Sequence, residues 1–337
     1  MSHVIIVTSY KGHEWDGGDS VITAGLFVLW PDLKEQKLIY SRDIEYQRVD
    51  EVVASAKYIV HAGTPSWMTV ENRPIWKAAI KHKKRIAMLG IGLALNYMSE
   101  MWYGAEEFIN LRDSGLIDVI VCRDKPCYYW LHQKYGFPSE HIRVLPCPGF
   151  YAVEPDRAWT KNKVFFSLAN VEETAHETQY TFERYYDKCA YVVEELTKSG
   201  ATVSLVYQRA MTEAFSVLLK EKFFEKDINS FDNCEEFCEF VRSQEVYIGV
   251  RNHGALPCAG AGKPSLLLGT DYRQYLADEI PFISKIDISH ARWHPREILD
   301  WYAALEPENI AASLVNYRNI TYKRWQDAIE PIRSSIA

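Results

Sequence analysis

The sequence predicts an α/β protein with two Rossmann-like domains, each organised around a parallel sheet. Short β-branched apolar runs alternate with amphipathic stretches, which is the pattern of parallel α/β architecture. The chain has 337 residues, more than one hydrophobic core usually organises, so two domains are expected. Apolar residues make up 47% of the chain and charged residues 25%, as in an ordinary globular protein.

The first domain is predicted to begin with a strand at residues 3–8, HVIIVT. After a loop, residues 19–30 form a helix in which Asp19 or Ser20 can cap the exposed amides and which Pro31 ends. Further strands, each leading into a loop or helix, are predicted at residues 57–63, 85–92 and 118–124.

A linker is predicted at residues 146–163, where the periodicity lapses and Pro, Lys and Asp accumulate. We therefore expect an N-terminal Rossmann-like domain over residues 1–155 and a C-terminal one over 156–310. Residues 311–337 are expected to be a helical tail that packs back across the domains.

In the second domain the alternation restarts with a strand at residues 163–170. A helix over 185–200, closed by Gly200, and a strand over 201–207 follow. A further helix is predicted at 231–244, where four apolar or thiol side chains recur at helical spacing and are expected to contact the core. These four are Cys234, Phe237, Cys238 and Val241.

Charge and cysteine usage limit the classes of function. The net charge of -7 argues against nucleic-acid binding, which normally needs a basic face. The seven cysteines are scattered without paired zinc-site spacing, and the histidines lie in different elements, so no metal is expected. The N-terminal apolar run resembles a strand more than a signal peptide, and no run is long enough to span a membrane. These features predict a cytoplasmic protein with reduced thiols.

The candidate site lies in a predicted βαβ unit made of a strand at 245–250, a loop and helix at 251–262, and a strand at 263–269. Arg251 and His253 come just beyond the carboxyl end of the first strand, where open α/β sheets bind ligands. Arginine offers a fork of donors for carboxylate or phosphate, and histidine exchanges a proton near neutral pH.

Gly254 opens the helix that follows, whose first amides are free to hold an anion. The alternative is a surface arginine beside a loop-capping histidine. The AGAGK segment ends this helix instead of following a strand, so it does not predict a phosphate-binding Walker loop.

Other candidates also follow predicted strands. Arg273 comes after the strand at 263–269 and is either a second anion ligand or a solvated loop residue. Gly18 would let a ligand approach the backbone, and Asp19 would face the ligand or only cap the helix. Arg123 precedes Asp124, and such a pair is most often a local salt bridge that fixes a loop.

Several of these motifs occur in a familiar order. GGD stands before a helix, AGT and GIG follow two strands, and RDKPCYYWL and GVRNHGALPCAGAGKP come later. This order resembles the polysaccharide pyruvyl transferase family over nearly the whole chain. The last motif is the most specific, and its match is close.

The resemblance implies two Rossmann-like domains in a GT-B-like arrangement with the active site in an interdomain cleft. It implies an enzyme that transfers pyruvate from phosphoenolpyruvate to a sugar or glycan precursor, lipid-linked or free, and forms a ketal. No cofactor is expected, and the chain gives no indication of oligomeric state. Exopolysaccharide and other glycan biosynthesis is the setting that the family suggests.

The resemblance also implies roles for the candidate residues. His253 would be the acid/base and Arg251 an anion ligand, while Asp19 would orient or deprotonate the acceptor hydroxyl. Arg123 matches the family's RD arginine, and Arg273 falls where members carry a basic residue. Three positions depart from the family pattern and bear on the acceptor and donor more than on the fold. They are Cys127 in place of Ser, Cys147 in place of Asp and Arg273 in place of the frequent Lys.

Two other functions remain open. A GT-B-type glycosyltransferase would bind the diphosphate of a nucleotide sugar at the same kind of anion site. It should also carry an acidic residue that binds the ribose, and no convincing candidate stands near residues 263–269. A non-catalytic sugar- or anion-binding relative would keep the fold, although His253 beside Arg251 weighs against it. Fold alone does not decide among these functions.

Overall fold

The chain divides into two compact units, each of which is described by itself. The first comprises Met1–Glu14, Asp19–Ala152 and Asn319–Ala337, and the second comprises Trp15–Gly18 and Val153–Arg318. The computed structural model describes residues 4–8, 18–40, 46–63, 72–93, 105–155, 159–168, 182–207, 219, 221–223, 227–270, 272–288 and 293–336.

The first unit contains a six-stranded parallel sheet in the order β2-β1-β3-β4-β5-β6. The four strands predicted from the sequence are confirmed as β1, β3, β4 and β5. The two additional strands are short and stand at the edges, where few residues need to be apolar. The strands are β1 (Val4–Thr8), β2 (Lys37–Tyr40), β3 (Tyr58–Ala62), β4 (Arg85–Ile91), β5 (Ile117–Cys122) and β6 (Ile142–Val144).

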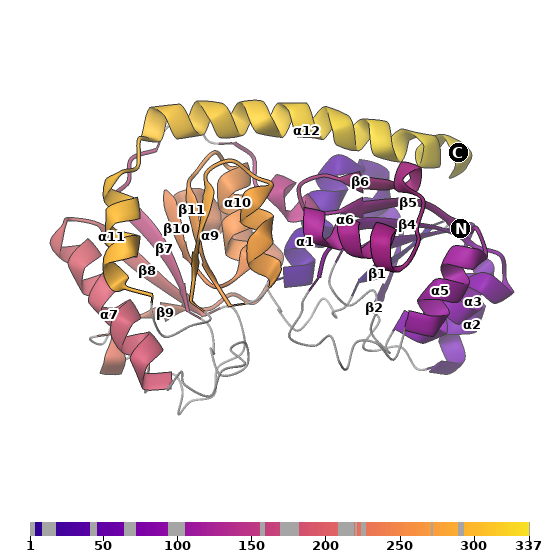
Figure 1. Cartoon of the computed structure of the whole chain (residues 1–337), viewed down its shortest axis with the longest axis horizontal. Helices are drawn as coiled ribbons and strands as arrows, with labels where there is room; N and C mark the ends of the chain where they lie inside the picture. Colours follow the sequence, from indigo (N-terminus) through magenta and orange to yellow (C-terminus); the bar gives the residue numbers. More distant parts are fainter. Residues whose placement is uncertain are drawn as a thin grey trace. The chain divides into compact units, whose positions relative to one another are not determined.

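Helices cover one face of this sheet through a continuous apolar core. Side chains of the strands, such as Ile59 and Met88, pack in one cluster with Val53, Trp76 and Phe108 of three helices. Figure 1 shows these helices grouped beside the sheet. They are α2 (Tyr46–Ser55), α3 (Arg73–Lys81) and α5 (Ala105–Asp113).

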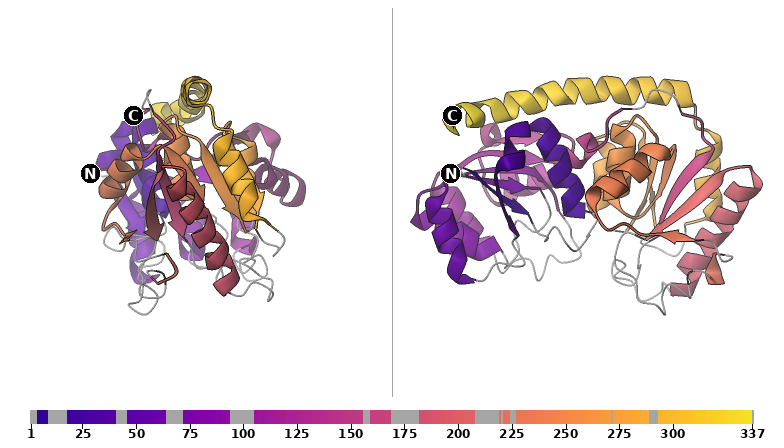
Figure 2. Two further views of the ribbon diagram at one scale, coloured as in Figure 1. Left: turned by 90° about the vertical axis from the view of Figure 1, so that its left-hand side faces the viewer. Right: turned by 180° about the vertical axis from the view of Figure 1, so that it is seen from behind.

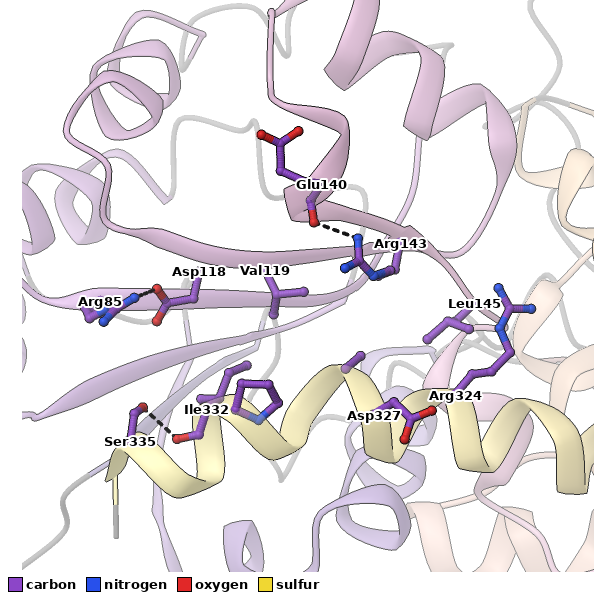
Figure 3. Close-up of a pocket in the computed structure, with 12 residues that line it drawn as sticks. Arg85, Asp118, Val119, Glu140, Arg143, Leu145, Arg324, Asp327, Ile332 and Ser335 are labelled. Carbon is purple, nitrogen blue, oxygen red and sulfur yellow. Dashed lines mark hydrogen bonds and ion pairs between the residues drawn. The ribbon is translucent and has the colours of Figure 1, made fainter.

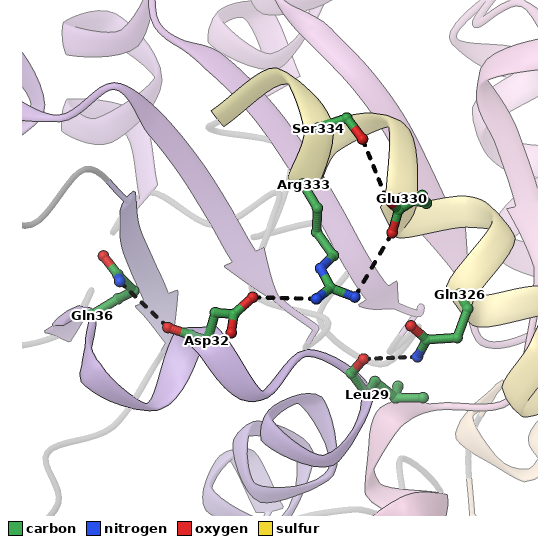
Figure 4. Close-up of polar contacts among 7 residues, drawn as sticks. All are labelled: Leu29, Asp32, Gln36, Gln326, Glu330, Arg333 and Ser334. Atoms are coloured by element: carbon green, nitrogen blue, oxygen red, sulfur yellow. Dashed lines mark hydrogen bonds and ion pairs between the residues drawn. The ribbon is translucent and has the colours of Figure 1, made fainter. Parts of the chain in front are cut away.

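The C-terminal helix α12 (Pro307–Ile336) begins in the second unit and ends in the first. Within the first unit, Trp325 Nε1 donates to the Pro146 carbonyl at 3.1 Å, and Gln326 Nε2 donates to the Leu29 carbonyl at 2.8 Å. Arg333 pairs with Asp32 at 3.3 Å, as Figure 4 shows. Leu29 is the last residue of α1 (Gly18–Leu29), so α12 is hydrogen-bonded directly to the end of that helix.

The second unit also contains a six-stranded parallel sheet, in the order β12-β11-β10-β7-β8-β9. Numbered along this unit, its strands run 6-5-4-1-2-3, which is the Rossmann order read from the other edge. The order reverses between β7 and β10, and such a switch point is where this architecture binds ligands. The strands are β7 (Lys163–Leu168), β8 (Thr202–Tyr207), β9 (Ile228–Asn229), β10 (Val246–Gly249), β11 (Ser265–Gly269) and β12 (Ile283–Asp287).

Helices lie on both faces of the second sheet, as Figure 2 shows. α7 (Phe182–Lys198) and α11 (Pro295–Ala303) pack together on one face, and α9 (Cys234–Ser243) and α10 (Asn252–Gly260) pack together on the other. In α9, the predicted core contacts Phe237 and Val241 are buried. Cys234 and Cys238 differ from that prediction because they are only half-buried, with their sulfur atoms 3.9 Å apart.

Short helical segments complete the described structure. They are α6 (Lys125–Tyr129), the π-helical turn Trp130–Lys134, and the 3₁₀ turns Pro31–Glu35, Ser139–His141, Pro148–Tyr151 and Tyr272–Asp278. Within the residues that the structure describes, no helix combines the length and the apolar character that crossing a bilayer requires.

Candidate functional site

The carboxyl end of β10 forms the centre of the candidate site. In register, Gly249 at the end of β10 lies beside Ser167 of β7, so this strand end is at the switch point of the second sheet. Arg251 and His253 follow within four residues of Gly249. The structure therefore places both residues at the edge where open parallel sheets bind their ligands.

Arg251 is the N-cap residue of α10, with an extended backbone (φ −94°, ψ 120°). Its carbonyl accepts the amide hydrogen bond of Gly254 at 3.1 Å, which begins the helix. The phenol of Tyr247 donates to the same carbonyl at 2.6 Å, and the Arg251 amide donates to the Tyr247 oxygen at 3.1 Å. The Arg251 backbone is thus held on both sides of its Cα, while its side chain is only partly buried.

All of α10 except His253 is buried. The Asn252 side chain donates to the Arg273 carbonyl at 3.1 Å, which connects the start of α10 to the turn after β11. Ser265 Oγ of β11 donates to the Ala255 carbonyl at 3.0 Å. Because the rest of the helix is fixed in the core, its first turn and His253 are presented at the strand end on a rigid support.

Two glycines are required where the backbone approaches a ring. A Cβ at Gly254 would lie 2.2 Å from Tyr247 Cε2. A Cβ at Gly18, a residue grouped with the second unit, would lie 2.5 Å from His253 Cε1. The space expected above Gly18 for a ligand is therefore occupied by the His253 imidazole. The structure brings Gly18, Arg251, His253 and Gly254 together, and Asn252 connects them to Arg273.

Asp19 lies inside the first turn of α1, because that helix already begins at Gly18. Asp19 and Ser20 both lie within the helix, so the prediction that one of them is its N-cap residue is wrong. Asp19 is partly exposed, and its carbonyl accepts a hydrogen bond from Thr23 Oγ1 at 2.8 Å. A carboxylate in the first turn is favoured by the helix dipole, and this stabilising role is compatible with a second role in binding the acceptor.

Arg123 follows β5 but is only 1% exposed. Its Nε lies 3.5 Å from Asp124 Oδ2, and Asp124 Oδ1 accepts the Cys127 amide at 2.8 Å as the N-cap of α6. A Cβ on Gly92 would meet Arg123 Nε at 2.0 Å, so the guanidinium packs directly over that glycine. The described contacts are those of a buried salt bridge that fixes a loop, and substrate binding by Arg123 stays a prediction.

The two cysteines at positions that depart from the family pattern are fully buried. Burial raises the pKa of the Cys147 thiol to about 11 and raises the pKa of Cys127 well above its ordinary value. Cys127 belongs to the apolar core of the first unit. Both thiols are therefore neutral packing groups near neutral pH.

Lys263, the lysine of the AGAGK segment, is 1% exposed. Its ammonium group donates to the Arg242 carbonyl at 2.6 Å, at the C-terminal end of α9. Trp159 Nε1 donates to the Gly262 carbonyl at 3.0 Å. This segment is a buried turn between α10 and β11 that fixes α9, and it does not lead from a strand into a helix as a Walker-type loop does.

A cavity of about 590 Å³ lies in the first unit between β4, β5, β6 and α12. It opens near the amino ends of β4 and β5, where Arg85 pairs with Asp118, as Figure 3 shows. Its wall also includes Arg143, which donates to the Glu140 carbonyl at 2.6 Å, and Arg324 of α12. The predicted site residues are not among the described residues that line this cavity, which faces the sheet edge opposite to the usual ligand edge.

Sequence reasoning missed two residues of the candidate site, Tyr247 and Asn252. Tyr247 is a polar residue within a buried strand, four positions before Arg251, and that exception to an apolar run could have indicated a hydrogen-bonding role. Asn252 carries no such signal, because its partner is the backbone of Arg273, 21 positions away.

Several solved structures have the same fold. The Staphylococcus aureus MnaA–UDP structure has a TM-score of 0.65 at 12% identity, covering 99% of this chain and 97% of that one. The Anabaena Alr3699/HepE structure with UDP and glucose has a TM-score of 0.61 at 10% identity, covering 100% and 99%. The Neisseria meningitidis UDP-GlcNAc 2-epimerase bound to UDP-GlcNAc has a TM-score of 0.56 at 12% identity, covering 93% and 98%. At these identities the likeness concerns the fold, and it confirms the predicted pair of Rossmann-like domains of GT-B-like type.

Among curated protein sequences no significant match is found. The model of the polysaccharide pyruvyl transferase family, in contrast, matches residues 4–272. The match runs from β1 to the turn after β11 and includes Asp19, Arg123, Arg251 and His253. It spans all the motifs whose order resembles this family. The chain belongs to the polysaccharide pyruvyl transferase family, a family of transferases.

Proposed function

We propose that the protein transfers pyruvate from phosphoenolpyruvate to a sugar or glycan precursor and forms a ketal across two hydroxyls. The observation that carries the proposal is the placement of Arg251 and His253 at the switch point after β10, beside the start of a buried helix. Phosphoenolpyruvate brings a carboxylate and a phosphate, which arginine and helix amides bind well. Family membership supports the same chemistry.

In this scheme His253 gives a proton to the methylene carbon of phosphoenolpyruvate, which leaves an oxocarbenium-like centre at C2. A sugar hydroxyl adds to C2 and loses its proton to a base. The C–O bond to phosphate then breaks, a second hydroxyl forms the new bond to C2 and gives its proton to the departing phosphate, and inorganic phosphate leaves. Histidine suits the first step because its ordinary pKa lies near neutrality. We assign Asp19 the role of orienting or deprotonating the acceptor, from its place in the GGD motif.

Arg251 and Arg273 are the proposed anion ligands of the second unit. Arg251 has a fixed backbone and a partly exposed side chain, and Arg273 is held by Asn252 through its carbonyl. An arginine binds carboxylate or phosphate through two parallel donors, so lysine should replace it poorly. The scheme requires no cofactor or metal, and its expected place in the cytoplasm stays a prediction.

The test is release of inorganic phosphate from phosphoenolpyruvate in the presence of a panel of sugar acceptors, free and diphospholipid-linked. His253→Ala should lower kcat by about 10²- to 10⁴-fold, the usual contribution of a general acid. Arg251→Ala should raise KM for phosphoenolpyruvate, and Arg251→Lys should restore little of the loss. Matched controls are His141→Ala and Arg296→Ala, which remove exposed residues of the same types.

A nucleotide-sugar transferase is the second candidate. It is favoured by solved structures of the same fold that contain UDP or UDP-GlcNAc. Thermal unfolding with UDP, UDP-GlcNAc or phosphoenolpyruvate separates the two functions, since a ligand stabilises the state that binds it. Stabilisation by UDP compounds, together with no binding or turnover of phosphoenolpyruvate, would overturn the pyruvyl transferase proposal. Stabilisation by either ligand without turnover of any acceptor would favour a binding relative.

A further inference from the structure

We infer that Tyr247 is a positioning residue for Arg251 and His253, acting through the backbone of Arg251. Its importance for catalysis rests on the proposed function, whereas the hydrogen bonds on which it depends can be tested without any substrate. The match to the family covers this region but carries no information on what Tyr247 does. Tyr247 is the second residue of β10, and its side chain is fully buried.

The phenol of Tyr247 bridges both polar groups of a single residue. It donates to the Arg251 carbonyl at 2.6 Å and accepts from the Arg251 amide at 3.1 Å. The two bonds fix the peptides before and after the Arg251 Cα, and hence the direction in which the side chain leaves the backbone. The same carbonyl accepts from Gly254 at 3.1 Å, so Tyr247 also fixes the first turn of α10, which carries His253.

The ring of Tyr247 supports the same turn by packing. A Cβ at Gly254 would lie 2.2 Å from Tyr247 Cε2, so the backbone of the turn rests directly on the ring. Phe165 of β7 contacts the tyrosine ring edge to face, with ring centroids 4.9 Å apart. The position of the phenol is therefore set by the sheet, and the strand end and the helix start are joined through one side chain.

Burial raises the pKa of Tyr247 above its ordinary value. The phenol therefore keeps its proton across the physiological range and remains a donor to the Arg251 carbonyl. An apolar residue at this position would leave the carbonyl and amide of Arg251 with one fewer partner each, and a desolvated polar group without a partner is costly. The arrangement predicts that removing one oxygen atom loosens the motif while the core stays packed.

The test is Tyr247→Phe in the full chain, with Tyr185→Phe as control. Tyr185 is a fully buried tyrosine of α7 whose ring contacts Tyr186 and Trp293, so its variant removes a buried phenol while the hydrogen bonds of Tyr247 to Arg251 remain. Amide hydrogen exchange measured by NMR should show the Arg251 amide exchanging at least about tenfold faster in Tyr247→Phe, as expected for loss of its hydrogen bond. The amides of β7 should exchange as in the unmodified protein in both variants.

Phosphate-release kinetics then give the second readout. Tyr247→Phe should raise KM for phosphoenolpyruvate and lower kcat, so that kcat/KM falls by about tenfold or more. Tyr185→Phe should retain the original values of both constants. Unchanged exchange at Arg251 in Tyr247→Phe overturns the inference. If the Arg251 amide exchanges faster in Tyr247→Phe but kcat and KM of an active enzyme are unchanged, the inference is overturned as well.

Failure of the proposed function would look different. If the unmodified protein neither binds nor turns over phosphoenolpyruvate, while the Arg251 amide exchanges faster in Tyr247→Phe, the pyruvyl transfer scheme fails and the positioning of Arg251 by Tyr247 stands. Binding of UDP in place of phosphoenolpyruvate, weakened by Tyr247→Phe and not by Tyr185→Phe, would support positioning for another anionic ligand.

Discussion

Arg251 and Arg123 each follow the carboxyl end of a buried parallel strand, yet their surroundings differ. The Arg251 side chain is partly exposed, and the contacts that fix this residue act on its backbone. The Arg123 side chain is 1% exposed and pairs with Asp124, which is equally buried. The contacts described for Arg251 act on its main chain and leave its side chain partly exposed, whereas Arg123 is held through its buried guanidinium.

The difference shows that a strand-end arginine is not sufficient to predict a ligand contact. The anion-binding edge of a sheet also needs its loops fixed, and a buried ion pair does so through the side chain, whereas the Tyr247 hydrogen bonds do so through the backbone. In the second arrangement the arginine side chain stays partly exposed, so a carboxylate or phosphate in solution can reach it. Substitutions at the two positions should therefore separate stability from function.

The largest effect on stability is expected for Arg123→Ala. It leaves the Asp124 carboxylate buried without its partner, and breaking such a pair usually costs about 3–5 kcal/mol in free energy of unfolding. Arg251→Ala should cost less than about 1 kcal/mol, because the backbone contacts remain. Urea unfolding of both variants measures the difference.

Arg123→Ala/Asp124→Asn is the matched control for the buried pair. The amide oxygen of Asn can still accept the Cys127 amide and cap α6, but it carries no charge. The double variant should therefore recover part of the lost stability. Equal stability of Arg123→Ala and Arg251→Ala would contradict the distinction between the two arginines.

An intermediate effect is expected at His61, a third polar residue near a strand end. His61 is 1% exposed, stacks on Trp76 with ring centroids 5.5 Å apart, and its Nδ1 has no hydrogen-bond partner among the described residues. Burial lowers its pKa to about 3. The unfolded chain therefore binds a proton here between about pH 6.5 and pH 3 that the folded chain does not, so stability is complete above pH 6.5 and falls as the pH is lowered.

From pH 7.5 to pH 5.0 this histidine alone should remove about 2 kcal/mol from the free energy of unfolding. His61→Phe keeps a ring against Trp76 and cannot take up a proton, so it should lose about 2 kcal/mol less over the same interval. Urea titrations of both proteins at the two pH values provide the measurement. Parallel losses in the two proteins would show that the imidazole is protonated in the folded state.

The smallest effect is expected at Arg333, whose ion pair with Asp32 is exposed to solvent (Figure 4). The Asp32 side chain is 71% exposed, so solvent screens the attraction. Arg333→Ala should cost less than about 1 kcal/mol, and 0.5 M salt should reduce the cost further. A loss comparable to that of Arg123→Ala would mean that burial does not govern the energy of these pairs.

Most strands of both sheets could be predicted from local patterns. Runs such as HVIIVT and KVFFSL are mainly apolar because strands of a parallel sheet are covered on both faces, and β1 and β7 are fully or almost fully buried. The four edge strands β2, β6, β9 and β12 escaped prediction because each contains at most one buried residue. The pairing order is a long-range property, since it depends on crossovers that no local pattern records.

The candidate site divides in the same way. Arg251, His253 and Gly254 could be identified from their position after a strand and before a helix, because they are contiguous in sequence. Three other features could not be identified from the sequence, because the residues involved meet only after folding. They are the burial of Arg123, the ring of His253 over Gly18, and the hydrogen bond from Asn252 to Arg273.

The sequence by itself determined the two Rossmann-like domains, the family and the strand end that carries Arg251 and His253. Periodicity and short motifs suffice for these because they reflect contacts between residues close along the chain. Only the folded chain shows which arginine is buried in an ion pair and which has a partly exposed side chain, and it reveals Tyr247 as the group that fixes the Arg251 backbone. The reason is physical: burial and hydrogen bonding at a site depend on which strands become neighbours, and that is settled only when the sheet is assembled.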